Sequence, residues 1–301
     1  MASLLLTRIC APQSQMRGRR LLHVCQALHG VDKNHLAKLR KKTGFAISNC
    51  KKALEMHNND FEKAEAWLHA EAQAHGWAKA TKLSGRKTTQ GLIGIHIEGN
   101  LGAIVEVNCE TDFVARNEKF KTLVAKVARE CMNSVTPRQN HGVIKEAFSE
   151  EHLKGFQTSE GNTLGDLLAL AIGTIGENMS LPRAVRIQGS PGTHLVGISH
   201  PSTLDQNLQT GKYGAILALK SSCELTEVAK QLCVHVIGMN PKVIGTLSDP
   251  KASNPDDETT LVHQEFLTDP AKTVGEVLQE ENIEIVDFVR FESGEQTVDI
   301  N

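Results

Sequence analysis

Apolar residues recur every three or four positions in three consecutive segments between residues 33 and 74. This spacing gives a helix one apolar face, so it predicts three amphipathic helices that share a small core. Thr43 and Gly44 separate the first two segments, and Asn59 and Asp60 are expected to cap the third, where side-chain oxygens can accept hydrogen bonds from free amides. The expected core positions are Leu36, Leu39, Cys50, Ala53, Leu54, Phe61, Ala64, Trp67 and Leu68.

From residue 92 onward the apolar period changes to two. Leu92–Val107 alternates apolar and polar positions around a turn at Gly99 and Asn100, which predicts a β-hairpin. Residues 195–200 and 211–219 repeat this plan, and a segment with helical spacing follows each hairpin. We therefore expect two related subdomains, each a hairpin plus a helix. The two helical faces are Phe120, Leu123, Val124, Val127, Ala128 and Cys131, and Leu225, Val228, Ala229, Leu232, Cys233 and Val236.

The two copies differ where the strand joins the helix. Thirteen positions separate Val107 from Phe120, but six separate Leu219 from Leu225, so the first copy carries seven additional residues. An insertion that the second copy lacks is not required by the shared core, and such loops normally lie at the surface. The inserted stretch contains Thr-Asp-Phe-Val at 111–114.

Phe113 stands out in this loop because only 4% of the chain is aromatic. Two interpretations remain open from position alone. Phe113 is either an exposed anchor for a partner outside the chain, or a plug that folds back over its own hairpin.

Composition excludes several classes of protein. The chain has 33 basic and 35 acidic residues, a net charge of -2, which argues against direct nucleic-acid binding or a membrane surface. No apolar run approaches the roughly 20 residues that a bilayer requires. The cysteines are scattered and form no C-x-x-C pair, so we expect a reducing compartment and no zinc site. We also expect no other metal site and no cofactor. The cysteines are Cys10, Cys25, Cys50, Cys109, Cys131, Cys223 and Cys233.

The first 31 residues differ from the rest of the chain. Arg8, Arg17, Arg19 and Arg20 lie among Leu, Ser and Gln, and no acidic residue precedes Asp32. This composition is typical of a mitochondrial transit peptide, which predicts the mitochondrial matrix as the destination. A disordered basic tail is the alternative.

Residues 43–68, TGFAISNCKKALEMHNNDFEKAEAWL, resemble the ubiquitin-associated fold. That resemblance implies that the loop after the first helix presents Gly44, Phe45 and Ile47 to a partner. The alternative is that Phe45 and Ile47 fill the small core. A ubiquitin-binding adaptor is therefore one functional hypothesis.

A second resemblance covers most of Lys33 to Glu295. The stretches VNCETDFVARNEKF, LRKKTGFAISNCKKAL, IGENMSLPRA, HVIGMNPKVI and KTVGEVLQEENIEIVDFVRFESGE resemble blocks of the elongation factor Ts family, in that family's order. Together with the leader, they indicate a mitochondrial member. The resemblance implies an α+β fold, with a ubiquitin-associated-like three-helix domain followed by two related α/β subdomains.

The resemblance also implies a function and its residues. Members of the family are guanine nucleotide exchange factors for elongation factor Tu, here the mitochondrial one, and bind it with GDP or without nucleotide. The aromatic of the TDFV motif is inserted beside the magnesium site of the GTPase, and GDP then leaves. The residues that match partner-binding positions are Thr111, Asp112, Phe113 and Val114 in the loop, Ile47 and Ser48 in the N-terminal domain, and His200 in the second subdomain.

An enzyme would show a catalytic constellation. The sequence contains no G-x-S-x-G elbow, P-loop, G-x-G-x-x-G or H-E-x-x-H motif, so we expect no catalysis by side chains.

The predicted domain boundaries follow these patterns. They are a transit peptide at 1–31, a three-helix domain at 32–76, a basic linker at 77–90, the first subdomain at 91–190, the second at 191–295, and a tail at 296–301. Within the first subdomain, residues 133–162 are expected to form a mobile loop with one short helix. Only about thirty residues separate Asn240 from Lys272, too few for the long helical hairpin that bacterial members insert there.

Overall fold

The computed structural model describes residues 31–43, 45, 47–134, 141–201, 209–221 and 227–295. Most of the predicted transit peptide, the tail at 296–301, Gly44 and Leu225 therefore lie outside the described residues. The chain divides into two compact units, Met1–Leu68 and His69–Asn301.

The first unit contains the three predicted helices, α1 (Lys33–Thr43), α2 (Ile47–Met56) and the start of α3 (Phe61–Leu83). Its core confirms the spacing predicted from the sequence, and the Asp60 carboxylate accepts a hydrogen bond from the Lys63 N–H at 3.1 Å. The buried core residues are Leu39, Cys50, Ala53, Leu54, Ala64 and Leu68, with Val31, Leu36, Phe45, Phe61 and Trp67 packed against them.

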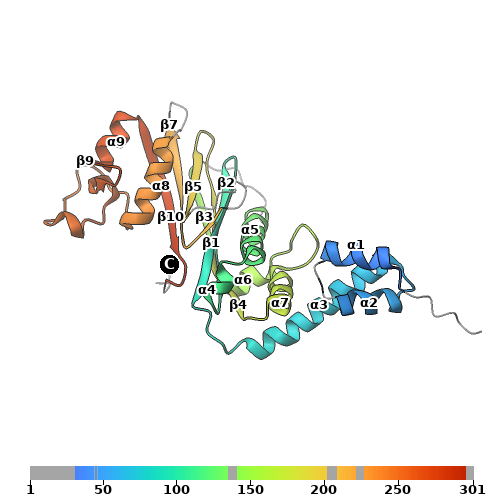
Figure 1. The fold of residues 1–301 in the computed structure, drawn as a ribbon. Coiled ribbons are helices and arrows are strands. Elements are labelled where there is room, and N and C mark those ends of the chain that lie inside the picture. Colours follow the sequence, from blue (N-terminus) through green and yellow to red (C-terminus); the bar gives the residue numbers. More distant parts are fainter. Residues whose placement is uncertain are drawn as a thin grey trace, which may run out of the picture. The chain divides into compact units, whose positions relative to one another are not determined.

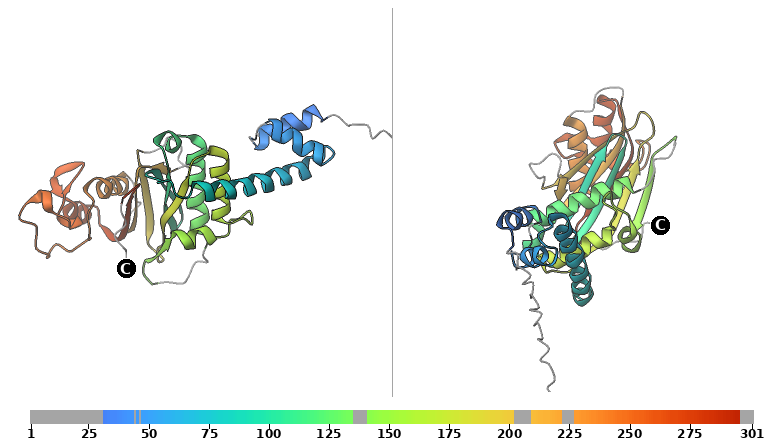
Figure 2. Two further views of the ribbon diagram at one scale, coloured as in Figure 1. Left: turned by 90° about the horizontal axis from the view of Figure 1, so that it is seen from below. Right: turned by 90° about the vertical axis from the view of Figure 1, so that its right-hand side faces the viewer.

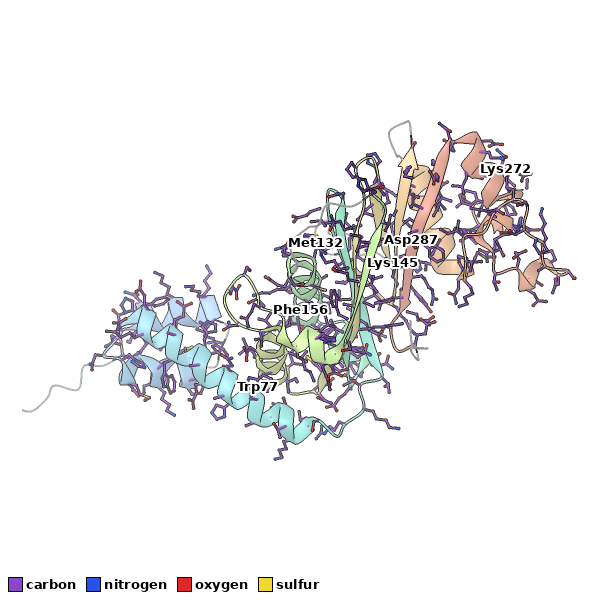
Figure 3. The ribbon with its side chains drawn as sticks, turned by 180° about the vertical axis from the view of Figure 1, so that it is seen from behind. Trp77, Met132, Lys145, Phe156, Lys272 and Asp287 are labelled. Atoms are coloured by element: carbon purple, nitrogen blue, oxygen red, sulfur yellow. The ribbon has the colours of Figure 1, made fainter. Side chains whose placement is uncertain are left out.

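Helix α3 continues well past the predicted end of the helical domain, to Leu83. The prediction of a linker from residue 77 is therefore wrong for residues 77–83. A Cβ atom on Gly76 would overlap the carbonyl oxygen of Ala169, so α3 packs backbone to backbone against α7 (Leu164–Ile175). The indole N–H of Trp77, which Figure 3 labels, also donates to the Asp166 carboxylate at 2.9 Å. These contacts stabilise the helical conformation of the last part of α3, where many side chains are polar or small.

The second unit is built around two larger antiparallel sheets. The five-stranded sheet has the order β3-β4-β2-β1-β6, and the three-stranded sheet has the order β10-β7-β5. The strands of the first are β1 (Gln90–Glu98), β2 (Leu101–Cys109), β3 (Ile144–Ser149), β4 (Met179–Gln188) and β6 (Gln209–Gly211). Those of the second are β5 (His194–His200), β7 (Tyr213–Ser221) and β10 (Ile283–Glu292).

The two sheets pack against each other through one apolar layer, and helices cover their outer faces (Figures 1 and 2). Helices α5 (Glu118–Asn133) and α7 share a core with the first sheet, and α8 (Glu227–Met239) and α9 (Val274–Glu280) share one with the second. The layer between the sheets consists of Ile93, Ile95, Ile104, Val185, Ile187, Leu195, Ile216, Ala218, Val289 and Phe291.

The predicted duplication is confirmed. The hairpin β1-β2 precedes α5, and the strand pair β5-β7 precedes α8; the apolar helical positions predicted in both copies are buried or partly buried wherever they are described.

The repeat also extends further than the pattern indicated. In each copy another helix and strand follow, so that β4 lies beside β2 as β10 lies beside β7. Both later helices start with the same capping box, Thr163 with Asp166 and Thr273 with Glu276. The sequence carries this signal as TLGDL at 163–167 and TVGEV at 273–277, which hydrophobic periodicity alone does not detect.

Residues 133–162 differ from the predicted mobile loop. Their described part forms the edge strand β3 and the short helix α6 (Glu150–Gly155), and of these only the helix was predicted. Strand β3 pairs with β4, Phe148 stacks edge-on against Phe156, and Lys145 forms an ion pair with Asp287 of the other sheet at 2.7 Å (Figure 3). A short, partly polar edge strand is stabilised mainly by such distant partners. Its own sequence therefore alternates too weakly between apolar and polar residues to predict a strand.

Residues 241–273 contain no long helix pair, as predicted. They form loops, two 3₁₀ turns at Pro255–Asp257 and Leu261–His263, and a small two-stranded sheet of β8 (Glu265–Phe266) and β9 (Asp269–Thr273).

Candidate functional site

The inserted loop follows β2 and forms a single helical turn, α4 (Asp112–Ala115). Thr111 is its N-cap: the hydroxyl accepts a hydrogen bond from the Val114 N–H at 3.3 Å. The same threonine is held by Glu177, whose carboxylate accepts from the Thr111 N–H at 3.1 Å and from its hydroxyl at 2.7 Å. Thr111 is thus a structural anchor of the loop.

Residues next to Thr111 and Glu177 add further bonds. The Asn178 N–H donates to the Glu110 carboxylate at 2.6 Å, and its side-chain amide donates to the Arg86 carbonyl at 2.8 Å. Arg86 also forms an ion pair with Glu110 at 3.3 Å. The loop is therefore fixed at its base by groups from three separate parts of the chain.

The side chains of the turn point in opposite directions. Val114 and Ala115 are 9% and 8% exposed and belong to the core under α5, whereas Phe113 is 80% exposed. The interpretation of Phe113 as a plug over its hairpin is therefore wrong. A large ring left in water on a rigid base is the arrangement expected of a binding anchor.

The other polar groups of the loop are paired on the surface. Asp112 forms an ion pair with Arg116 one turn later, at 2.9 Å, and both side chains are exposed.

Cys109, the last residue of β2, is buried just before the loop. Burial, and secondarily the charge of Glu177, raises the pKa of the Cys109 thiol to about 12, so this cysteine is neutral and unreactive at neutral pH.

A hollow of about 650 Å³ adjoins the loop. One side of it comes from the loop and from the start of β1, and the other from Lys212 and Ser293 of the second subdomain. Its lining also includes Leu92, which is partly buried, and Ala115, which is buried. Both subdomains therefore contribute to the surface beside Phe113.

His200 is the last residue of β5 and is exposed. It lies opposite Tyr213 in the strand register, and Lys212, which lines the hollow, immediately precedes Tyr213. His200 is therefore paired with the residue that follows Lys212, although His200 itself does not line the hollow.

Ile47 and Ser48 belong to the first unit, in the first turn of α2, and both are exposed; Ile47 is 48% exposed. Ile47 lines a shallow hollow of about 440 Å³ with Leu36 and Ala37 of α1. The rim of this hollow is basic and consists of Lys33, Arg40 and Lys41.

Phe45, in contrast, packs against the core of the helical unit. Of the two residues that the sequence allowed either in the core or at a partner surface, Phe45 is therefore a core side chain and Ile47 is not.

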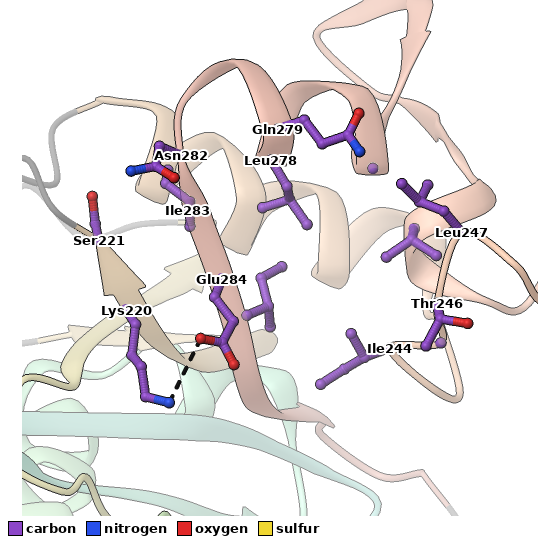
Figure 4. Close-up of a pocket in the computed structure, with 14 residues that line it drawn as sticks. Lys220, Ser221, Ile244, Thr246, Leu247, Leu278, Gln279, Asn282, Ile283 and Glu284 are labelled. Atoms are coloured by element: carbon purple, nitrogen blue, oxygen red, sulfur yellow. Dashed lines mark ion pairs between the residues drawn. The ribbon is translucent and has the colours of Figure 1, made fainter.

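Another hollow of the second unit lies away from the loop, between α9, the start of β10 and residues 244–247 (Figure 4). It measures about 710 Å³ and contains the ion pair of Lys220 and Glu284 at 3.6 Å. Nothing in its lining resembles a nucleophile with an adjacent base.

No group of three or more His, Cys, Asp or Glu side chains suited to a metal ion occurs among the described residues. Within the same part of the chain, no helix combines the length and the apolar character needed to cross a bilayer.

Sequence reasoning missed the groups that support the loop. Glu110, Glu177, Asn178 and Arg86 lie as much as 92 residues apart and meet only in the folded chain. Glu177 and Asn178 belong to the stretch IGENMSLPRA. The sequence showed that this stretch resembles a family block, but it did not show which residues the stretch contacts. Lys212, which lines the hollow, has no sequence signal of its own, because it is an exposed lysine beside a strand.

The fold and the loop define a class of protein: a helical domain joined to two related α/β subdomains, with an aromatic side chain presented on a rigid surface turn. A family model described as "Elongation factor Ts, mitochondrial, N-terminal" matches residues 19–78, and one described as "Elongation factor TS" matches residues 110–253 and 245–295. The chain belongs to the elongation factor Ts family.

Individual relatives agree with the family models. The chain is 50% identical over 274 residues to a protein of Aedes aegypti named "Elongation factor Ts, mitochondrial", covering 88% of this chain and 89% of that one. A protein of the same name from Drosophila melanogaster is 51% identical over 277 residues, covering 89% and 87%. The human protein of that name is 43% identical over 274 residues, covering 87% and 83%.

Proposed function

We propose that this chain is a guanine nucleotide exchange factor for mitochondrial elongation factor Tu and acts in the mitochondrial matrix during translation elongation. The observation that carries the proposal is Phe113, a ring 80% exposed on a turn whose base is fixed by Thr111 and Glu177. Membership of the elongation factor Ts family and the names of its mitochondrial relatives support it.

The proposed mechanism is displacement of charge. Magnesium bridges the phosphates of GDP and the GTPase, and it is the largest local charge at that site. Insertion of Phe113, with Asp112 beside it, into the elements that flank the magnesium site moves the ligands of the metal. Phosphate binding then weakens and GDP leaves, while this chain undergoes no covalent change and holds no cofactor.

The remaining predicted contacts add affinity. Ile47 and Ser48 present an apolar and polar pair from α2, and His200 lies at the end of β5. In this proposal they contact the partner in addition to the loop, so that docking does not depend on Phe113 alone.

The test is stopped-flow release of fluorescent GDP from mitochondrial elongation factor Tu. The release rate should rise with the concentration of this protein and reach a plateau. A rate that stays at its spontaneous value at every concentration would reject the proposal.

The hypothesis of a ubiquitin-binding adaptor has less support, because Phe45 packs against the core of its own unit. A pull-down from matrix extract, compared with immobilised ubiquitin, separates the two hypotheses. Retention of ubiquitin without elongation factor Tu would favour the adaptor.

A further inference from the structure

The hollow beside Phe113 contains an unbalanced charge. Asp112 is paired with Arg116 at 2.9 Å, and Glu110 is paired with Arg86 at 3.3 Å. Lys212 lines the same hollow, is exposed, and has no carboxylate partner among the described residues. The acidic groups of the hollow are thus neutralised by their own neighbours, and one ammonium group is left over.

The position of Lys212 is fixed by a buried network that joins the two subdomains. The Lys212 carbonyl accepts a hydrogen bond from the Ser293 N–H at 2.9 Å, and the Gly294 N–H donates to Glu106 at 2.8 Å. Glu106 is 2% exposed and also forms an ion pair with Arg183 at 2.7 Å.

Glu106 lies on β2, the strand that runs directly into the Phe113 loop. The loop and the backbone of Lys212 are therefore attached to one rigid frame. A binding surface held in this way loses little entropy when it docks.

We propose that the Lys212 ammonium binds a carboxylate of the partner's nucleotide domain when the Phe113 loop docks, and that the hollow receives this acidic side chain. The inference rests on the proposed function and adds a specificity-determining residue to it. Charge complementarity is the reason for a carboxylate, since every other ionised side chain of the hollow already has an opposite charge beside it. Leu92 and Ala115 give the lining an apolar part, and a charge pair is stronger beside apolar groups than in bulk water.

The experiment compares Lys212→Met, Lys212→Glu and Lys212→Arg with a matched control, Lys242→Glu. Lys242 is an exposed lysine of the same subdomain that does not line the hollow. The dissociation constant is measured with nucleotide-free mitochondrial elongation factor Tu, and GDP release is measured by stopped flow, each over a series of salt concentrations.

Lys212→Met should weaken binding about 3- to 10-fold and Lys212→Glu more than about 10-fold, because a like charge replaces the attraction. Lys212→Arg should bind within about 3-fold of wild type, since it keeps the charge. The loss in Lys212→Glu should shrink at about 1 M salt, where the screening length falls to about 3 Å. Lys242→Glu should stay within about twofold of wild type, as exposed charges away from an interface usually do.

Equal effects of Lys212→Glu and Lys242→Glu would overturn the inference. Slower GDP release by Lys212→Glu without any loss of affinity for the nucleotide-free partner would also overturn it, since the anion would then be a phosphate of the nucleotide. If the wild-type protein fails to accelerate GDP release, the proposed function itself is rejected, and that result is read before any variant is compared.

Discussion

At the scale of single residues, the TDFV turn separates two tasks. Thr111 and Val114 hold the turn, one through its hydroxyl and the Glu177 carboxylate and the other in the core, whereas Phe113 takes no part in the core. An exposed phenylalanine contributes little to folding, because burial of its apolar area is what stabilises a protein. The ring is therefore free to serve binding.

Replacement of Phe113 by alanine tests this separation. Truncating an aromatic at the centre of an interface costs about 2 kcal/mol or more, and about 1.4 kcal/mol is a tenfold change in an equilibrium constant. Phe113→Ala should slow stimulated GDP release by about tenfold or more, while the melting temperature stays within about 1 °C, as for other surface substitutions. Stopped-flow release and thermal unfolding measure the two quantities.

Val243→Ala is the control for this experiment, since Val243 is also exposed, at 53%, and lies outside the loop. It should leave both quantities unchanged. A lowered melting temperature with normal release per folded Phe113→Ala molecule would contradict the assignment.

At the scale of secondary-structure elements, two kinds of contact stabilise the second unit: close packing of helices α3 and α7, and hydrogen bonds of a buried histidine on α8. Helices α3 and α7 meet at Gly76 and Gly173, where the backbones come too close for a side chain on Gly76. Helix α8 holds residues 264–267 through the ring of His235. The ring is hydrogen-bonded to the Gln264 side chain at 3.0 Å and accepts a hydrogen bond from the Leu267 N–H at 3.2 Å.

Gly76→Ala tests the helix contact. The added methyl group meets the backbone of Ala169, which cannot move aside as a flexible side chain would. Overpacking of this kind costs about 1–3 kcal/mol, so the free energy of unfolding should fall by that amount in urea titration. Gly85→Ala is the matched control, because a Cβ atom there meets open space. Equal stabilities of the two variants would contradict the predicted contact.

His235 predicts a dependence of stability on pH. Burial lowers the pKa of His235, against the smaller opposing effect of its hydrogen bond with Gln264. Below the unfolded-state pKa of about 6.5, the unfolded chain therefore binds a proton that the folded chain resists, and stability falls as pH falls.

The free energy of unfolding from urea titration should thus decrease between pH 7.5 and 5.5. His235→Gln removes the titrating group and should give a flatter profile over the same range. Identical slopes for this variant and wild type would exclude His235 as the cause.

At the scale of the whole second unit, the packing of two sheets brings distant segments to one surface. Strand β6 pairs with β1 of the first sheet, and the chain then enters β7 of the second, so Lys212 lies where the chain passes between the sheets. The residues after β10 return to β2 through Ser293 and Gly294. The surface beside Phe113 is thus built jointly by both copies of the repeat.

Exchange by such a surface has a thermodynamic consequence. Coupling between two ligands of one protein is reciprocal, so a factor that lowers the affinity of the GTPase for GDP must itself be released by GDP to the same extent. Titration of the complex with GDP should therefore dissociate it, with equal coupling factors measured in both directions by fluorescence and calorimetry. A complex indifferent to GDP would leave only a scaffolding role.

The sequence by itself determined the elements whose signal is local. Helical spacing placed the core of the first unit, including Leu39 and Leu54, and alternation placed both hairpins, because these periodicities follow from backbone geometry alone. Comparison of the two copies located the inserted loop at 111–114. The family blocks then indicated which of its residues to examine, and the structure places all four in or beside the turn α4.

Only the tertiary structure decided the matters that depend on partners far away in sequence. It placed Phe113 in solvent rather than over its hairpin, extended α3 to Leu83, and made residues 144–149 an edge strand. It also brought Glu177 to Thr111 and Lys212 to the hollow beside the loop. Each outcome is decided by contacts between segments that no local pattern relates, because side-chain packing and hydrogen-bond geometry exist only once those segments have met.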